Sequence, residues 1–444
     1  MTATLSPVPA LGPWREIASL PTAETRLANG LRVLAVARPG APLVEVRLSI
    51  PFGSTDPAHP ARSWLLSETV LSGTARSGRL ELADRLGDLG ASLRAEVDHD
   101  QVLFCGTASA HAHDDLLVVL LEALLEAAYP DDEVAAERTR LASRLQAARS
   151  QAAVRAREIL HRHLYGDHPY AHSMPTGDEV AAVTPEDLRA LHASRITPDD
   201  AVLVMVGALD PEEALEKASR LFGGWRAAGV PLEVVPDLPP EAPAGASRLF
   251  HRPGSVQSSI RIGGPALRRD DPLFPALQLA NLIYGGYFSS RLVANIREDK
   301  GYTYTPRSRI VHHLAGSTLW IEADVATEVT APALLEMWYE LGRLSTMRPS
   351  PAELDDVRQY AAGRLAMSVA TRAGLATTLA TLVGVGLDMD WLRAHPRRLA
   401  EVTASDIYHV GVHLLAPKLL AAVVIGDASE CEEPLQAFGP WVVE

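Results

Sequence analysis

The 444-residue sequence predicts an α+β protein made of two homologous domains of similar topology. Three observations lead to this prediction. The two halves repeat the same short motifs in the same order, each half alternates strand-like with helix-like segments, and a proline-rich stretch separates the halves. The expected domains are residues 1–229 and 247–444, joined by a linker at 230–246.

The repeat is long and nearly constant in spacing. An Arg-Pro-Gly motif at 38–40 recurs at 252–254, which is 214 residues later. A Thr followed three residues later by Asp, the pattern of a helix N-cap, occurs at 184 and again 219 residues later at 403. Each half then closes on a Phe-Gly pair followed by a Trp. Motifs that recur in this order indicate a duplicated domain.

Strands and helices follow one another in both halves. Apolar and polar side chains alternate through residues 44–50, which is the period of a half-buried strand. The further elements expected are strands at 101–109 and 317–325, and helices at 115–129, 132–164, 331–344 and 352–370. This order favours helices packed on one face of a sheet.

Composition narrows the class of function. Hydrophobic residues make up 47% of the chain and charged residues 22%, as in a soluble globular protein. The net charge of −14 argues against nucleic acid as the main partner, because the phosphate backbone demands clustered Lys and Arg. Cys105 and Cys431 are too few for a disulfide framework. Neither a signal peptide nor an apolar run of transmembrane length is evident, so we expect a cytoplasmic protein without a membrane partner.

One segment of the second half carries a specific motif. Residues 285–304 read GGYFSSRLVANIREDKGYTY, in which Tyr304 follows Arg297 by seven positions. This segment resembles the C-terminal-half signature of the pitrilysin/insulinase metallopeptidases, the family that includes mitochondrial processing peptidase. The opening of the first half, NGLRVLAVARPGAPLVEVRLSIPFGS, is also similar to that family. The resemblance covers essentially the whole chain and implies domains with mixed, largely antiparallel sheets that form half of a clamshell.

The zinc-binding motif of the resembled family is altered. Active members hold zinc with His-x-x-Glu-His on a helix, in which the Glu is the general base. The corresponding positions here are occupied by Trp64, Ser67 and Glu68. A further Glu ligand expected downstream is also missing, because residues 138–157 contain neither Asp nor Glu. Indole does not ligate zinc and no base remains, so we expect no zinc in this chain.

The resemblance gives Arg297 and Tyr304 a role on the substrate. A guanidinium and a phenol aimed at the scissile carbonyl oxygen, or at its neighbours, would stabilise the charge that builds up there. Gly285 and Gly286 would let a peptide backbone approach closely. From the residues alone a simpler interpretation stays open, in which the Arg forms a surface ion pair with Glu298 or Asp299 and the Tyr is a packing residue.

Other possible sites are less specific. His409 and His413 have the i, i+4 spacing of a metal pair but no acid between them, which favours a structural role. His111 and His113, His161 and His163, and His312 and His313 lack an acidic or Cys partner at ligand spacing. Glu68 is more typical of a solvated or ion-paired helix residue than of a general acid or base.

In some bacterial members of the resembled family, one chain carries His-x-x-Glu-His and a second chain carries the Arg/Tyr pair. The resemblance therefore implies a non-catalytic, substrate-binding subunit that complements a homologous, zinc-bearing partner in a heterodimeric endopeptidase. The substrate would be a small unstructured peptide, bound extended against a sheet edge. Two alternatives remain open at this point. The chain is a structural or scaffold protein of the same fold, as in the zinc-less core subunits of a respiratory complex, or it is a peptide-binding homodimer without catalysis.

Overall fold

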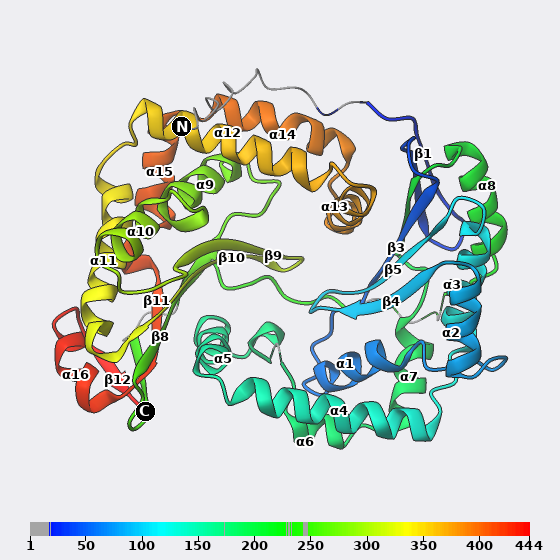
Figure 1. Ribbon diagram of the computed structural model, residues 1–444, viewed down its shortest axis with the longest axis horizontal. Coiled ribbons are helices and arrows are strands. Elements are labelled where there is room, and N and C mark those ends of the chain that lie inside the picture. Colours follow the sequence, from blue (N-terminus) through cyan, green and yellow to red (C-terminus); the bar gives the residue numbers. More distant parts are fainter. Residues whose placement is uncertain are drawn as a thin grey trace, which may run out of the picture.

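The computed structural model describes residues 17, 19–172, 174–227, 229, 231, 233–242 and 247–444. Two six-stranded sheets stand on opposite sides of the molecule, each with helices packed against it (Figure 1). The expected α+β class is therefore confirmed, as is the expectation of a mixed sheet in each half.

The first sheet has the strand order β1-β2-β6-β3-β5-β4. Its strands are mostly antiparallel, and only β2 and β6 pair in parallel. The central strand β6 is apolar along its whole length because both of its faces are buried. The bounds are β1 Thr22–Arg26, β2 Arg32–Ala37, β3 Leu43–Pro51, β4 Ser92–Val97, β5 Gln101–Ser109 and β6 Val202–Gly207.

The second sheet repeats this plan with the order β12-β7-β11-β8-β10-β9. Strand β11 runs parallel to its neighbour β7, as β6 does to β2 in the first sheet. The edge strand β12 differs from its counterpart β1, because it comes from the end of the chain and pairs in parallel with β7. The strands are β7 Ser247–His251, β8 Gln257–Ala266, β9 Arg307–His313, β10 Gly316–Ala326, β11 Ala421–Gly426 and β12 Trp441–Val443. Strand β4 forms one edge of the first sheet, and β9 forms the equivalent edge of the second.

The helices also correspond between the halves. The side chains of Thr184 and Thr403 both accept a hydrogen bond from a backbone N–H three residues on, as their sequence pattern predicts. The first half contains α1 His59–Thr69, α2 Arg79–Asp88, α3 His113–Glu126, α4 Asp131–Arg149, α5 Ala152–Tyr165, η1 Pro169–His172, α6 Gly177–Ala181, α7 Pro185–Arg195 and α8 Pro211–Phe222. The second contains α9 Phe274–Asn281, η2 Leu282–Gly286, α10 Arg291–Val293, η3 Ala294–Asp299, η4 Thr327–Val329, α11 Thr330–Thr346, α12 Pro351–Ser368, α13 Arg372–Gly384, α14 Met389–Glu401, α15 Ala404–Leu414, η5 Pro417–Leu419 and α16 Ala428–Gln436.

The two halves exchange a helix. Helix α5 packs on β8 and β11 of the second sheet, and α13 packs on β3 and β6 of the first. The single long helix expected at 132–164 is therefore wrong, because the chain breaks at Gln151, which has an extended backbone, and α5 turns toward the other half. Helices also cover both faces of the first sheet rather than one, since α13 lies on the face opposite α3 and α8 (Figure 1). The exact domain boundaries stay a prediction.

The exchanged helix α13 should contribute to the stability of the first half. Leu379 is fully buried in a cluster that joins α13 to Leu34 on β2 and Val204 on β6. Leu379→Ala should lower the free energy of unfolding by about 2–5 kcal/mol in urea titrations. The matched control is Leu335→Ala on α11, where the side chain is 47% exposed. A change within about 0.5 kcal/mol of wild type at Leu379 would contradict this packing.

The described part of the predicted linker lies along both halves. Between residues 231 and 242 it forms no helix or strand. Glu233 accepts a hydrogen bond from the backbone N–H of Thr55 at 2.7 Å, and the N–H of Leu238 donates to Ala315 O at 2.8 Å. Among the described residues no single helix is long and apolar enough to cross a membrane, and the pair α12 and α13, which reaches that length together, is bent by 104°.

Candidate active site

Helix α1 carries the three positions at which the resemblance places a zinc motif. Glu68 points toward α4, where its Oε1 lies 2.6 Å from Nη2 of Arg144. The Ser67 hydroxyl donates to the carbonyl oxygen of Trp64 at 2.8 Å, which ties it to its own helix. The place expected for a metal and its general base therefore holds an ion pair and a hydroxyl that bonds to the backbone of its own helix.

These residues do not fit a zinc ion. The one carboxylate among them already faces a guanidinium, which is permanently positive and repels a cation. The α4 segment that packs on α1 offers Arg144 where a carboxylate ligand is needed. Within the described ranges no cluster of three or more His, Cys, Asp or Glu side chains is placed to hold a metal ion. No chemical step of this chain is therefore assigned to zinc.

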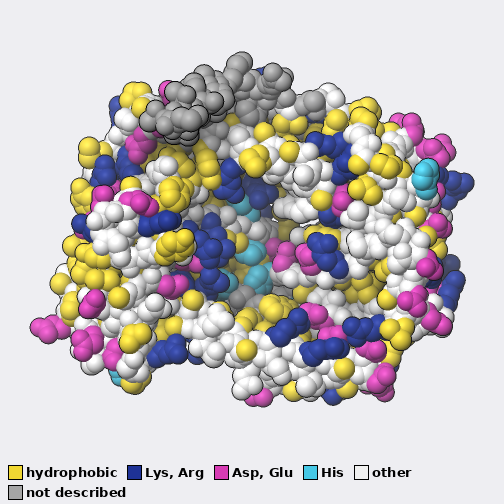
Figure 2. All heavy atoms as spheres, in the orientation of Figure 1, with side chains coloured by type: hydrophobic (Ala, Val, Ile, Leu, Met, Phe, Trp, Pro, Cys, Tyr) yellow, Lys and Arg dark blue, Asp and Glu magenta, His cyan; other side chains and the backbone are white. Residues whose placement is uncertain are grey.

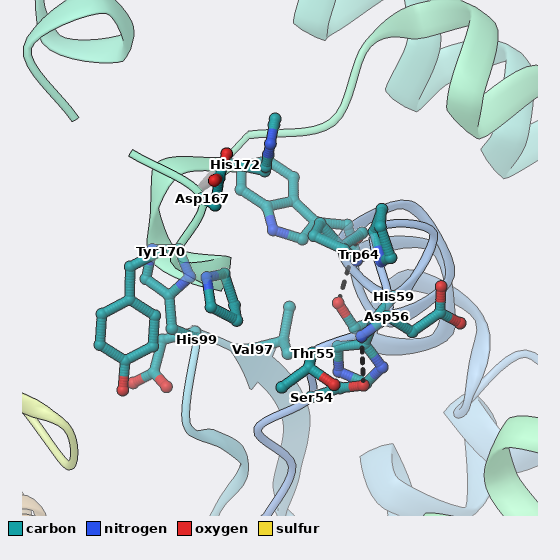
Figure 3. Close-up of a pocket in the computed structure, with 15 residues that line it drawn as sticks. Ser54, Thr55, Asp56, His59, Trp64, Val97, His99, Asp167, Tyr170 and His172 are labelled. Carbon is teal, nitrogen blue, oxygen red and sulfur yellow. Dashed lines mark hydrogen bonds between the residues drawn. The ribbon is translucent and has the colours of Figure 1, made fainter. Parts of the chain in front are cut away.

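A cavity of about 450 Å³ opens beside α1. In Figure 3 the Trp64 indole extends from α1 toward Asp167 and His172. Burial, reinforced by Arg195, lowers the pKa of His59 to about 4, so this side chain is uncharged at neutral pH. The remaining lining residues are Ser54, Thr55, Asp56, Pro57, Pro60, Ser63, Val97, Asp98, His99, Pro169 and Tyr170.

A polar cluster beside this cavity, which includes its lining residues His99 and Tyr170, joins the two halves. Asp100, in the turn between β4 and β5, accepts hydrogen bonds from the Tyr170 hydroxyl and, at 2.9 Å, from the backbone N–H of Leu314 between β9 and β10. The rings of His99 and His313 stand 5.4 Å apart beside this carboxylate. Burial lowers the pKa of His99 to about 4, with a smaller contribution from His313. This cluster joins the turn between β4 and β5 to the turn between β9 and β10.

Arg297 and Tyr304 lie together in the second half. The Arg297 guanidinium carbon is 4.7 Å from the centre of the Tyr304 ring and 4.8 Å from the centre of the Phe288 ring. Both rings are open to solvent, with Tyr304 77% and Phe288 65% exposed. Two aromatic faces thus hold one guanidinium by cation–π attraction at the protein surface.

The structure also contains the surface ion pair that the sequence allowed for Arg297. Its Nε lies 3.1 Å from Oε1 of Glu298, whose side chain is 55% exposed. An exposed ion pair of this kind contributes little stability and does not occupy the whole guanidinium. The role of Arg297 and Tyr304 on a substrate stays a prediction. Phe288 was missed by the sequence reasoning, although it stands in the same motif next to the two glycines.

Gly285 and Gly286 have a packing role of their own. A Cβ on Gly285 would stand 3.0 Å from the Ser308 Cβ, and one on Gly286 would stand 2.9 Å from a methyl carbon of Leu282. A larger side chain at either position would therefore press on close neighbours. Gly285 is buried, whereas Gly286 lines a second cavity, described below. Their proposed contact with a peptide backbone remains a prediction.

The remaining histidine candidates do not assemble a site. His409 and His413 lie side by side on α15 with ring centres 4.5 Å apart and ring planes tilted by 48°, and both are exposed. His312 hydrogen-bonds through Nδ1 to the Ser317 hydroxyl at 2.8 Å. The zinc-motif positions and the Arg297 cluster belong to different halves, with α1 at the bottom of Figure 1 and α10 at its left. This chain does not bring them together.

Comparison with known proteins agrees with this geometry. The family model described as Insulinase (Peptidase family M16) matches residues 32–176, and the model described as Peptidase M16 inactive domain matches residues 182–360. Together they cover more than half of the chain. A solved structure from Pseudomonas fluorescens, titled as a peptidase M16 inactive domain, superposes with a TM-score of 0.84 at 23% identity, over 92% of this chain and 98% of that one.

Curated relatives have similarly low identity to this chain. An uncharacterized zinc protease of Bacillus subtilis is 21% identical over 62% of this chain and 67% of its own length. A probable mitochondrial-processing peptidase subunit beta of Arabidopsis thaliana is 25% identical over 49% of this chain and 42% of its own length. The two family models, the duplicated sheets and the shared fold lead to one conclusion: the chain belongs to peptidase family M16.

Proposed function

We propose that this protein is the substrate-binding, zinc-free subunit of a heterodimeric M16 endopeptidase. Its partner would be a homologous chain that carries His-x-x-Glu-His and supplies both the zinc and the general base. The substrate would be a small unstructured peptide. The observation that carries the proposal is the Arg297 guanidinium, which lies over two exposed aromatic rings and whose ion-pair partner among the described residues is the exposed Glu298.

The chemistry of peptide hydrolysis explains why such a group is useful. Negative charge develops on the scissile carbonyl oxygen, and a preorganised donor aimed at that oxygen is worth more than one that must reorganise. The rings of Phe288 and Tyr304 fix the position of the guanidinium without neutralising it. The Tyr304 hydroxyl adds a second donor. Because α1 lacks a zinc ligand set, the reacting carbonyl must be held by another chain.

The zinc content of the purified chain and of the complex tests whether the partner alone supplies the metal. The purified chain should hold no stoichiometric zinc by elemental analysis, because Trp64, Ser67 and Glu68 offer no ligand set and Arg144 repels a cation. The 1:1 complex with the partner, isolated by size-exclusion chromatography, should hold one zinc per pair. One tightly held zinc in this chain alone would overturn the proposal, and His409 and His413 would then be the first residues to replace.

A further inference from the structure

A cavity larger than the one beside α1 lies between the halves, and Arg297 does not line it. It has a volume of about 760 Å³, within the range of ligand-binding sites. Helices α9, α12, α13 and α14 and strand β9 form its walls, and Arg47 of β3 and Arg94 of β4 reach it from the first half. A ligand in this cavity would contact the two halves at once.

The cavity is lined by one sign of charge. Five arginines and no described Asp or Glu contribute to its wall: Arg47, Arg94, Arg269, Arg309 and Arg364. In Figure 2 dark blue side chains gather around the hollow centre of this face, beside the cyan histidines. This is a marked local contrast with the net charge of −14 of the whole chain. Such a wall attracts anions and repels basic peptides.

Nearby carboxylates neutralise only part of this positive charge. Arg47 pairs with Glu45 at 3.0 Å and Arg94 with Glu96 at 2.7 Å. Arg309, in contrast, shares the single carboxylate of Glu322 with two further arginines, Arg157 and Arg307. Burial alone would raise the pKa of Glu322, but hydrogen bonds from these arginines hold it at about 2. One negative charge therefore faces three guanidiniums.

Arg269 is the least satisfied of the five arginines. It is half-buried, and no described residue lies within ion-pair distance of it. Burial lowers the pKa of Arg269. The pKa of His312 is lowered to about 3 and that of His395 to about 4, mainly by burial. The positive charge of Arg269 adds to both of these shifts. Removing a guanidinium partly from water without a partner is costly, which is expected where a ligand supplies the missing charge.

The rest of the wall suits a peptide. The Trp391 ring stacks on His395 with ring centres 4.5 Å apart, and the Phe274 ring also stacks with His395, with ring centres 5.8 Å apart. The buried Nε1 of Trp391 finds no acceptor among the described residues. Hydroxyl groups of Thr377, Thr378 and Thr381 on α13 lie along the same wall. Apolar rings beside unpaired donors match a chain with both apolar and anionic groups.

We propose that this cavity binds the carboxylates of an acidic peptide segment, with Arg269 and Arg364 as the principal contacts. The identity of the ligand as a peptide rests on the proposed function, whereas the preference for carboxylates rests on the arginines. The substrate class of the two-subunit enzyme is thereby narrowed to peptides with acidic residues at a distance from the cleaved bond.

Binding to the purified chain tests the proposal without the partner and without catalysis. Two fluorescent ten-residue peptides are compared that differ only in Glu against Gln at alternate positions, with both ends blocked. At low ionic strength the Glu peptide should bind at least about tenfold more tightly, by fluorescence anisotropy. Arg269→Gln should remove most of this preference. Arg348→Gln, an exposed arginine outside the cavity, should leave it unchanged.

The outcomes are distinct. Equal affinity for the two peptides, or an unchanged preference in Arg269→Gln, overturns the acidic-peptide site and leaves the two-subunit proposal standing. Sodium phosphate at matched ionic strength should displace the Glu peptide no better than chloride, and a much stronger displacement would assign the cavity to phosphate and overturn the peptide. If thermal unfolding shows that Arg269→Gln does not fold, Arg364→Gln replaces it, since that side chain is exposed on α12.

Discussion

Arg297→Ala should lower the peptidase rate of the reconstituted pair by about 10²–10³-fold, because one preorganised oxyanion donor is lost. Tyr304→Phe should cause a smaller loss, since the ring that holds the guanidinium at 4.7 Å is retained and only the hydroxyl is removed. Initial rates on a fluorogenic peptide at saturating partner concentration measure both. If the two residues only position the substrate, the loss will fall on KM rather than on kcat.

The matched control is Arg343→Ala. Arg343 also lies over a tyrosine ring, that of Tyr339 at 5.9 Å, but on α11 and outside the motif. Size-exclusion chromatography must show that each variant still forms the pair, since a variant that fails to assemble carries no information about catalysis. Wild-type rates in assembled Arg297→Ala and Tyr304→Phe pairs would refute the role assigned to this cluster.

The second large expected effect is a loss of folding stability at acidic pH. Burial lowers the pKa of His395 to about 4 from an ordinary value of 6.5, and Arg398 and Arg269 add to the shift. The folded state therefore binds fewer protons than the unfolded state below pH 6.5. Its stability is fully present above that pH and falls as the pH drops toward 4, by roughly 3 kcal/mol for this one side chain. His59, which is also buried and has a pKa of about 4, adds a similar loss.

Urea titrations between pH 7.5 and about 4.5 measure this slope. His395→Gln should cost stability at neutral pH, because the contact of Nε2 with Gln278 Oε1 at 2.7 Å is altered, yet it should flatten the fall with pH. His111→Gln, at an exposed position, should leave the slope unchanged. A stability that is level from pH 7.5 to 4.5 in the wild type would contradict the burial of these imidazoles.

Local patterns were enough to predict the duplicated plan. The alternation at 44–50 became β3, and the capping boxes at Thr184 and Thr403 set the starts of α7 and α15. These signals work because a cap or a half-buried strand depends on residues close in sequence. The resemblance of residues 285–304 to the family signature singled out Arg297 and Tyr304, and the structure places these two side chains side by side.

Local sequence patterns could not predict contacts between segments that are far apart in the sequence. The break at Gln151 has no proline or glycine to announce it, and it follows from the docking of α5 on the other half. The pairing of Glu68 with Arg144 joins helices 76 residues apart in sequence. The arginine-lined cavity collects residues from eight helices and strands and from the segment that holds Arg269, so no single stretch of sequence displays it. Tertiary packing decides such features, and local propensity does not encode them.

Peptidase activity of separated and mixed chains is the most direct test of the central claim. This chain and a homologous chain with His-x-x-Glu-His, each purified alone, are assayed on the same unstructured peptide and then mixed at equal concentration. Cleavage should appear only in the mixture and should depend on the intact Arg297. Cleavage by this chain alone at the rate of the mixture would contradict the account.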